Sequence, residues 1–178
     1  SVKKLNLTWY GGEPLMAFNK IKQIIHKIHT ECRVEICSQS IITNAYLLSD
    51  NVIRDMMELG FTQIQISFDG DEDNHNKTRF LKGSKGKTFA RIIKNLDNLV
   101  NQTPDNFKID LRINVNKTNE KDFAILYKKF IHRYGTKKIN PYPGFIRETS
   151  KDGCRMCYHY STLSVINSIK KYKEKEFL

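Results

Sequence analysis

Apolar and polar residues are ordered along the chain in a way that predicts alternating strands and helices. A period of two predicts strands over about residues 5–10, 34–44, 61–68, 108–116 and 138–142. Apolar positions at helical spacing predict helices over about 18–31, 49–60, 89–100, 119–135 and from about 160 onward, whereas residues 71–85 are expected to form a polar loop. Strictly alternating strands and helices with short connections indicate an α/β fold, built as a parallel sheet of right-handed βα units.

The predicted strands are apolar on one face only. In the third strand Ile64, Ile66 and Phe68 alternate with polar residues, and residues 109–116 repeat this alternation. A parallel sheet covered by helices on both faces would be apolar throughout. The favoured arrangement is therefore a curved sheet or partial TIM-like barrel, whose polar face lines an interior that can hold a charged ligand. An open sheet with one face in water is the alternative.

Small and polar residues gather where these strands end, which is where a barrel of this type places its chemistry. They are Gly11, Gly12, Glu13 and Pro14 after the first strand, Thr43 and Asn44 after the second, Ser67, Asp69 and Gly70 at the third, and Arg112, Asn114 and Asn116 on the fourth. The two adjacent glycines permit a close approach of the backbone, and Glu13 adds a carboxylate there. This combination suits a small cation such as an ammonium group, although a tight turn with a solvated Glu13 is the plainer alternative.

Composition and charge narrow the possible partners. The 178 residues suffice for one domain with a real core, and no apolar run approaches the ~20 residues that cross a bilayer. The formal charge is +11, and residues 128–178 carry 12 Lys or Arg against 4 Asp or Glu. The first residues are not expected to be a signal peptide, and the chain has no basic stripe interleaved with aromatics and no helix-turn-helix signature. A solvated basic face, or one that docks an acidic protein, is favoured over nucleic-acid binding, and no membrane association is expected.

The chain has four cysteines in two pairs. Cys32 and Cys37 have an incidental spacing, whereas Cys154 and Cys157 form a C-x-x-C in a loop-like stretch, a weak candidate for metal, cluster or redox chemistry. This pattern is not that of a secreted disulfide framework, so a reducing, cytoplasmic location is expected.

Residues 83–88, GSKGKT, imitate the end of a phosphate-binding P-loop. The first glycine of that motif would stand at position 81, which is Leu81, and no predicted strand directly precedes the loop. Nucleotide phosphate binding is therefore not expected here.

Five segments resemble, in order, motifs of the radical S-adenosylmethionine (SAM) enzymes, and in particular of the branch that carries a C-terminal SPASM-type cluster domain. The family's GGEP motif resembles residues 9–16, WYGGEPLM, and its TNG-LL motif resembles residues 42–48, ITNAYLL, with Ala45 in place of glycine. The S-x-DG…H-D-x-x-R pattern resembles residues 66–79, ISFDGDEDNHNKTR, with Asn76 in place of the commoner aspartate. Residues 86–89, GKTF, and 112–119, RINVNKTN, also resemble family segments. The resemblance covers residues 4–135 approximately.

The resemblance implies roles for these residues. Glu13, with the backbone of Gly11 and Gly12 in the motif that Pro14 closes, would receive the ammonium group of SAM. Ser67 and Arg79 would meet the SAM carboxylate, for which a guanidinium fork is well suited. Further cofactor-binding candidates are Thr43, Asn44 and Asp69, with Arg112 and Asn114 as contacts for SAM or substrate. His75 is expected to organise its loop rather than to bind a ligand.

The chain departs from the family at one essential point. Family members hold a [4Fe–4S] cluster through a C-x3-C-x2-C loop after the first barrel strand, and the 178 residues contain no such triplet. We therefore expect residues 1–145 to be barrel units two to six, and residues 146–178 to be a basic loop and helix leading toward a further domain. The cluster ligands are expected outside this chain, and the chain alone is expected to be inactive.

The resemblance implies the SAM-binding core of an oxidoreductase or maturase that generates a 5′-deoxyadenosyl radical and modifies a peptide or protein. An electron donor such as flavodoxin or ferredoxin is implied as a partner. One alternative is an anaerobic sulfatase-maturing, formylglycine-generating enzyme. Another is a non-catalytic, degenerate barrel that binds a peptide or nucleic acid.

Overall fold

The computed structural model of the chain describes residues 3–32, 34–81, 83–116, 119–145 and 167. Its elements in order are β1 (Lys4–Trp9), the 3₁₀ turn η1 (Pro14–Ala17), α1 (Phe18–Glu31), β2 (Glu35–Thr43), α2 (Asp50–Glu58), β3 (Gln63–Phe68), α3 (Glu72–Thr78), α4 (Phe89–Gln102), β4 (Lys108–Val115), α5 (Glu120–Tyr134) and β5 (Ile139–Phe145). The expected final helix from about residue 160, the segment 146–178 and the pair Cys154 and Cys157 lie outside the described residues, apart from residue 167.

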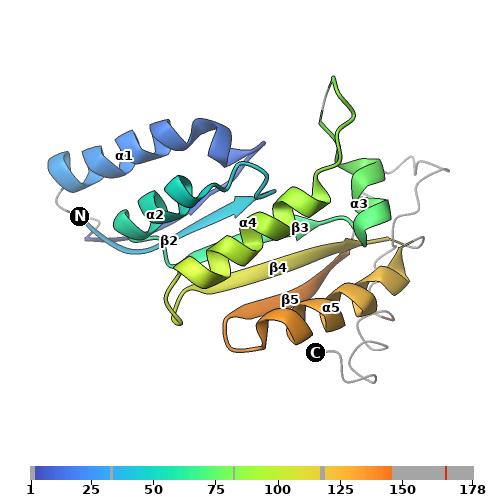
Figure 1. Cartoon of the computed structure of the whole chain (residues 1–178). Coiled ribbons are helices and arrows are strands. Elements are labelled where there is room, and N and C mark those ends of the chain that lie inside the picture. The colour runs from blue at the N-terminus through green and yellow to red at the C-terminus, as the bar shows by residue number, and fades with distance from the viewer. Residues whose placement is uncertain (1–2, 33, 82, 117–118, 146–166, 168–178) are drawn as a thin grey trace.

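The strands form one parallel sheet in the order β1-β2-β3-β4-β5. Each strand pairs with the next one in sequence, so every crossover runs in the same direction. Right-handed crossovers of this kind place all the connecting helices on one face, and α1, α2, α4 and α5 do cover the same face of the sheet (Figure 1). The expected parallel α/β architecture is confirmed, and its strand order is that of a barrel wall, with no reversal as in a doubly wound sheet.

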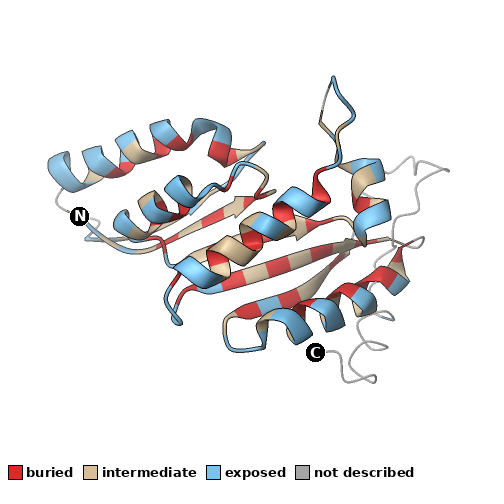
Figure 2. Cartoon of the chain, viewed as in Figure 1, coloured by how far each residue is buried: buried red, intermediate tan, exposed pale blue. Residues whose placement is uncertain are grey.

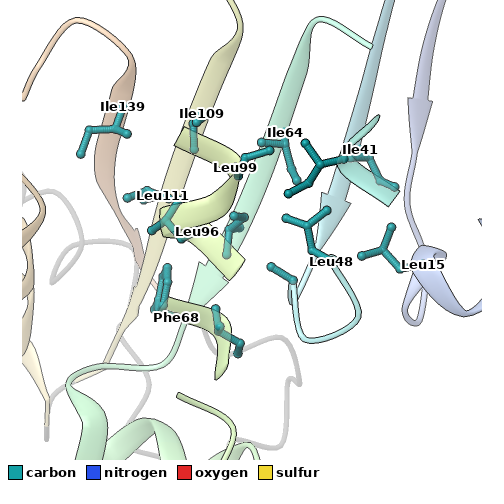
Figure 3. Packing of buried hydrophobic residues seen from close by; sticks show 14 of the residues in the cluster. Leu15, Ile41, Leu48, Ile64, Phe68, Leu96, Leu99, Ile109, Leu111 and Ile139 are labelled. Atoms are coloured by element: carbon teal, nitrogen blue, oxygen red, sulfur yellow. The ribbon is translucent and has the colours of Figure 1, made fainter. Parts of the chain in front are cut away.

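The core lies between the sheet and these helices. Along β3 the residues alternate between buried and half-buried, and β4 repeats this pattern, as the banding of the strands in Figure 2 shows. Apolar side chains from the strands meet those of the helices in a continuous cluster (Figure 3) that includes Ile64 and Phe68 of β3, Leu96 and Leu99 of α4 and Leu111 of β4. The opposite face of the sheet carries the polar residues, as the alternation predicts.

Local signals end the helices where the sequence indicates. Ser49 caps α2 by accepting a hydrogen bond from the backbone N–H of Val52, and Gly60 follows the helix with a φ of +77°. Among the described residues, no helix is both long enough and apolar enough to cross a membrane.

The expectation of a polar loop over residues 71–85 is wrong in its first half. Residues 72–78 form the short helix α3, which Asp71 caps by accepting the backbone N–H of Asn74. Only His75 of this helix is fully buried, so the segment has no apolar periodicity that sequence analysis could detect. Beyond α3 the chain protrudes from the domain as a loop (Figure 1), which an antiparallel bridge between Phe80 and Lys87 closes at its base. The P-loop lookalike lies in this loop.

Candidate functional site

A polar cavity of about 390 Å³ opens at the carboxyl ends of the first four strands. It brings together eight of the eleven predicted cofactor-binding residues, and its full lining is Tyr10, Gly11, Gly12, Glu13, Ile42, Thr43, Asn44, Gln65, Ser67, Arg79 and Arg112. The remaining candidates are not among the lining residues: Pro14 is buried at the start of η1, and Asn114 donates a hydrogen bond to Asp69, which pairs with the lining residue Arg79. Residues more than 100 positions apart therefore share one site.

The turn after β1 has a backbone conformation that residues other than glycine rarely adopt. Gly11 has a φ of +107° and Gly12 a φ of +51°, both in the left-handed region that favours glycine. A Cβ added to either residue would have no heavy atom within 4 Å. The requirement for glycine is thus conformational, and the open space beside the turn leaves its backbone accessible to a ligand.

Glu13 already has several partners at the cavity rim. One carboxylate oxygen accepts the backbone N–H of Leu15 at 3.0 Å and the hydroxyl of Thr43 at 2.6 Å, and the other accepts the backbone N–H of Asn44 at 2.9 Å. A carboxylate has about four lone-pair positions, so these three donors leave it able to accept another. The side chain therefore fastens the end of β1 to the end of β2, and it retains one acceptor position for a cationic ligand.

The loop after β2 is also fixed by its own side chains. The hydroxyl of Thr43 accepts the backbone N–H of Ala45, and the Asn44 amide oxygen accepts that of Tyr46. Ala45 has a φ of +58°, a left-handed conformation, at the position where the family motif has glycine. Asn95 of α4 donates to the carbonyl groups of Ala45 and Tyr46, which stabilises this loop from the helix layer.

Arg79 and Asp69 form a two-pronged ion pair. The Nε and Nη2 groups of Arg79 donate to the two carboxylate oxygens of Asp69 at 2.6 and 3.1 Å, and Asn114 donates to Asp69 at 2.7 Å. Burial opposes ionisation of Asp69, but the hydrogen bonds and charge of Arg79, with help from Asn114, keep its pKa below the usual value. Arg79 is thereby oriented by Asp69, and its Nη1 group remains for a ligand.

His75 organises the segment that joins β3 to α3. Its Nδ1 accepts the backbone N–H of Asp69 at 3.2 Å, and its ring packs against Phe68 and Phe89. Burial lowers the pKa of His75 from 6.5 to about 4, and the charge of Asp69 only partly offsets this effect. The ring is therefore neutral near pH 7, and its contacts agree with the expected organising role.

Arg112 and Asn114 project from β4 on the polar face of the sheet. The Nε of Arg112 and the Oδ1 of Asn114 are both buried, and neither has a hydrogen-bond partner among the described residues. Gly144 of β5 lies against both side chains, because a Cβ there would clash with Arg112 and lie 2.8 Å from the Asn114 Oδ1. This part of the site combines an unused donor with an unused acceptor.

Two residues that support the site were given no role from the sequence. Asp122 of α5 is buried and accepts hydrogen bonds from the backbone N–H of Asp71 and the side chain of Asn74, which fixes the loop after β3. The Asn76 Oδ1 accepts the backbone N–H groups of Thr88 and Phe89 and so caps α4. A carboxylate among the inward positions of a predicted helix was the one available signal for Asp122.

Comparison with known proteins extends these observations. Residues 2–130 match the model of the radical SAM superfamily. A Fe-coproporphyrin III synthase from Methanosarcina barkeri (strain Fusaro / DSM 804) is 25% identical over 117 residues, which are 66% of this chain and 26% of the synthase. The chain thus spans about a quarter of that relative.

Solved structures share the fold at low identity. A structure of native anSMEcpe with bound AdoMet has a TM-score of 0.74 and 16% identity, covering 98% of this chain and 47% of that one. Native anSMEcpe with bound AdoMet and Cp18Cys peptide has a TM-score of 0.72 and 16% identity, covering 96% of this chain and 46% of that one. The expected fold class, a partial TIM-like barrel, is confirmed by this likeness.

The cavity residues fit SAM but not its iron–sulfur cluster. An acceptor carboxylate, an accessible glycine backbone, a serine and the guanidinium group of Arg79 around one polar cavity match the ammonium and carboxylate groups of SAM. In contrast, the described residues contain no group of three His, Cys, Asp or Glu that could hold a metal ion. The chain also has no C-x3-C-x2-C segment.

Proposed function

Because the chain belongs to the radical SAM superfamily, we propose that it is the SAM-binding core of an enzyme that modifies a peptide or protein. SAM and a [4Fe–4S] cluster are the cofactors of this family. With one electron from the reduced cluster, SAM would be cleaved to methionine and a 5′-deoxyadenosyl radical, which would abstract hydrogen from the substrate. The observation that supports this proposal best is the convergence on one cavity of Glu13 after β1, Ser67 at the end of β3 and Arg79 at the end of α3.

In this proposal the chain's residues bind and orient the methionine end of SAM. Glu13 accepts the ammonium group beside the backbone of Gly11 and Gly12, and the hydrogen bonds from Thr43 and Asn44 hold its carboxylate in place. Arg79, oriented by Asp69, donates to the SAM carboxylate together with Ser67. Since the residues present do not fit the cluster, no step through the cluster is assigned to them.

The peptide substrate and the remaining partners are proposed as follows. The fold is shared with anSMEcpe, which has been solved with AdoMet and the Cp18Cys peptide bound, and this supports a peptide or protein substrate. We further propose an electron donor such as flavodoxin or ferredoxin. A cytoplasmic location is supported by the cysteine pattern, in which Cys32 and Cys37 are exposed and unpaired.

A tetrapyrrole substrate is the second candidate. The Fe-coproporphyrin III synthase is 25% identical to this chain over 117 residues. Titration of the full-length protein with coproporphyrin III and with a cysteine-containing peptide separates the two candidates. We expect saturable binding of the peptide and no binding of the porphyrin. The opposite result would make the tetrapyrrole the favoured substrate.

The central experiment measures SAM binding and cleavage. Full-length protein, purified without oxygen and reduced, is expected to bind SAM and to form 5′-deoxyadenosine. Residues 1–178 alone, treated with iron and sulfide, are expected to form none, because the chain lacks the cysteine triplet. Absence of SAM binding by the full-length protein would favour the non-catalytic, degenerate barrel instead.

The C-x-x-C of Cys154 and Cys157 is proposed to belong to an auxiliary cluster or to a structural loop, since two thiolates cannot replace three. Iron per chain in the full-length protein decides between the two. A fall in iron content when both cysteines are changed to alanine indicates the cluster, and unchanged iron indicates the loop.

A further inference from the structure

Arg112 is a cation without a counter-ion in the polar cavity. Among the described residues it makes no hydrogen bond and no ion pair, and its Nε is fully buried without a partner. A buried donor without an acceptor costs free energy, and the Arg112 Nε is such a donor. The Arg112 guanidinium is therefore available to bind a hydrogen-bond acceptor that the described residues do not supply.

The carboxylates that lie beside Arg112 in the sheet or around its cavity have other hydrogen-bond partners. Asp110, two residues earlier on the same face of β4, accepts hydrogen bonds from Gln63 at 2.5 Å and Asn140 at 2.8 Å. Asp69 is paired with Arg79, and Glu13 has its three donors at the rim. Since none of these carboxylates forms an ion pair or a hydrogen bond with Arg112, its guanidinium can pair with an anion from outside the chain.

The surroundings of Arg112 hold its side chain in place. In the sheet register it lies between Ser67 of β3 and Tyr142 of β5. Tyr142 donates its hydroxyl to Gln65 at 2.7 Å, and burial raises the pKa of Tyr142, so this hydroxyl stays protonated. The guanidinium also packs against Gly144, where any larger residue would displace it. Arg112 is thus a positioned donor with little rotamer freedom to lose on binding.

The position of Arg112 argues against the carboxylate of SAM as its ligand. Glu13 follows β1 and Arg112 lies on β4, three strand spacings away, which is roughly 14 Å across the sheet. By the same measure Ser67 on β3 is one strand spacing nearer to Glu13 than Arg112 is, so a SAM held by Glu13 and Ser67 reaches Arg112 last. The space in front of Arg112 is left for the second molecule in the cavity.

From this arrangement we propose that Arg112 binds a carboxylate of the substrate, so that the preferred substrate is an acidic peptide segment. The inference rests on the proposed function, because it assigns the other half of the same cavity. The carboxylate belongs either to an Asp or Glu side chain or to the C-terminus of the peptide. Arg112 acts as a specificity-determining contact, and its fork matches the two oxygens of that group.

The test uses full-length protein and three small probes. N-acetyl-glutamate N-methylamide represents an acidic side chain, N-acetylglycine a C-terminus, and N-acetyl-glutamine N-methylamide is the neutral control. Ligand-observed NMR titration is expected to show at least one carboxylate probe binding about 10-fold or more tightly than the neutral one. Arg112→Gln should abolish this preference, while Arg54→Gln, on the exposed side of α2, should leave it intact.

A second variant and a second readout keep the outcomes distinct. Arg112→Lys retains the charge without the fork and should keep part of the preference, which also covers the case of a poorly folded Arg112→Gln. SAM affinity, measured on the same samples, should change less than about 3-fold in both variants.

Two results would overturn the inference: wild-type protein that shows no carboxylate preference, or a loss of about 10-fold in SAM affinity on changing Arg112. If the wild-type protein does not bind SAM, the proposed function is contradicted instead. The role of Arg112 is then still decided by whether the same protein prefers the carboxylate probes.

Discussion

The carboxylate of Glu13, at the end of β1, accepts the hydroxyl group of Thr43, at the end of β2, over a distance of 2.6 Å. The two residues are 30 positions apart in sequence. Their contact means that Glu13 has a structural task before any ligand arrives, because it joins the two loops that form one wall of the cavity. The two interpretations of Glu13, as a turn residue or as a ligand-binding residue, therefore do not exclude each other. The same carboxylate can hold the turn and bind a cationic ligand.

Changing Glu13→Gln should weaken both SAM binding and the fold. One carboxylate oxygen becomes an amide NH₂, which then faces backbone N–H donors of Leu15 or Asn44. We expect a loss of about 1–3 kcal/mol in unfolding free energy and a fall of about 10-fold or more in SAM affinity. Denaturant unfolding and equilibrium SAM binding measure the two effects separately.

Glu58→Gln provides the matched control, because Glu58 is exposed at the end of α2. It should change neither quantity. Equal SAM affinity in the wild type and Glu13→Gln would remove the ammonium contact from the proposed function, even if the unfolding free energy falls as expected.

Asp69→Asn should release Arg79 from its orientation. The variant loses the charge that holds both prongs of the guanidinium, so unfolding free energy should fall by about 1–3 kcal/mol. Because the folded-state pKa of Asp69 lies below its unfolded value of 3.8, this contribution is present above pH 3.8 and disappears as the pH falls through the lowered pKa. Asp105→Asn, in an exposed turn, is the control and should have the stability of the wild type at pH 7.

The buried ring of His75 predicts a further loss of stability in mild acid. Its folded-state pKa of about 4 lies below 6.5, so between these values the unfolded chain binds a proton that the folded chain excludes. Unfolding free energy should therefore decline as the pH falls from about 6.5 to about 4, by up to about 3 kcal/mol. Urea unfolding across this range gives the slope.

His75→Asn removes the titrating group and should be less stable at pH 7 but flatter over the same range. His26→Asn, on the exposed face of α1, should retain the slope of the wild type. A slope that survives in His75→Asn would assign the effect to other groups.

Gly144→Ala should destabilise the sheet through contact with Arg112. The new methyl group overlaps the Arg112 side chain and costs about 1–3 kcal/mol. Truncating Arg112 to alanine removes most of that overlap, so the double variant should recover at least about 1 kcal/mol relative to additive effects. Purely additive losses in thermal unfolding would show that Arg112 does not press against Gly144.

The strands were predictable because their chemistry is local. Alternation in residues 64–69 and 109–116 reports directly which side chains face the helices, and those elements lie where expected. Since parallel strands bring their carboxyl ends to one edge, the gathering of Glu13, Ser67 and Arg112 followed from strand assignment alone.

The remaining features depend on contacts that no local pattern records. Helix α3 has one fully buried residue, His75, and it is held by a cap and by Asp122 from α5, 48 residues beyond Asn74. The pairing of Arg79 with Asp69 was likewise hidden, because a charged residue in a polar segment gives no sign of its partner. Sequence reasoning placed Arg79 near a ligand and could not foresee that a carboxylate orients it first.

The loop between Arg79 and Thr88 has a consequence for engineering. Its base is closed twice, by the Thr88 hydroxyl bonded to the Arg79 carbonyl at 2.7 Å and by Asn76 bonded to the start of α4, while residues 83–85 at its tip are exposed. Length added at the tip is separated from Arg79 by this double closure. The loop is therefore a natural insertion point. An affinity tag, a fluorophore or a whole reporter domain can be inserted there without changing the orientation of the Arg79 guanidinium at the cavity.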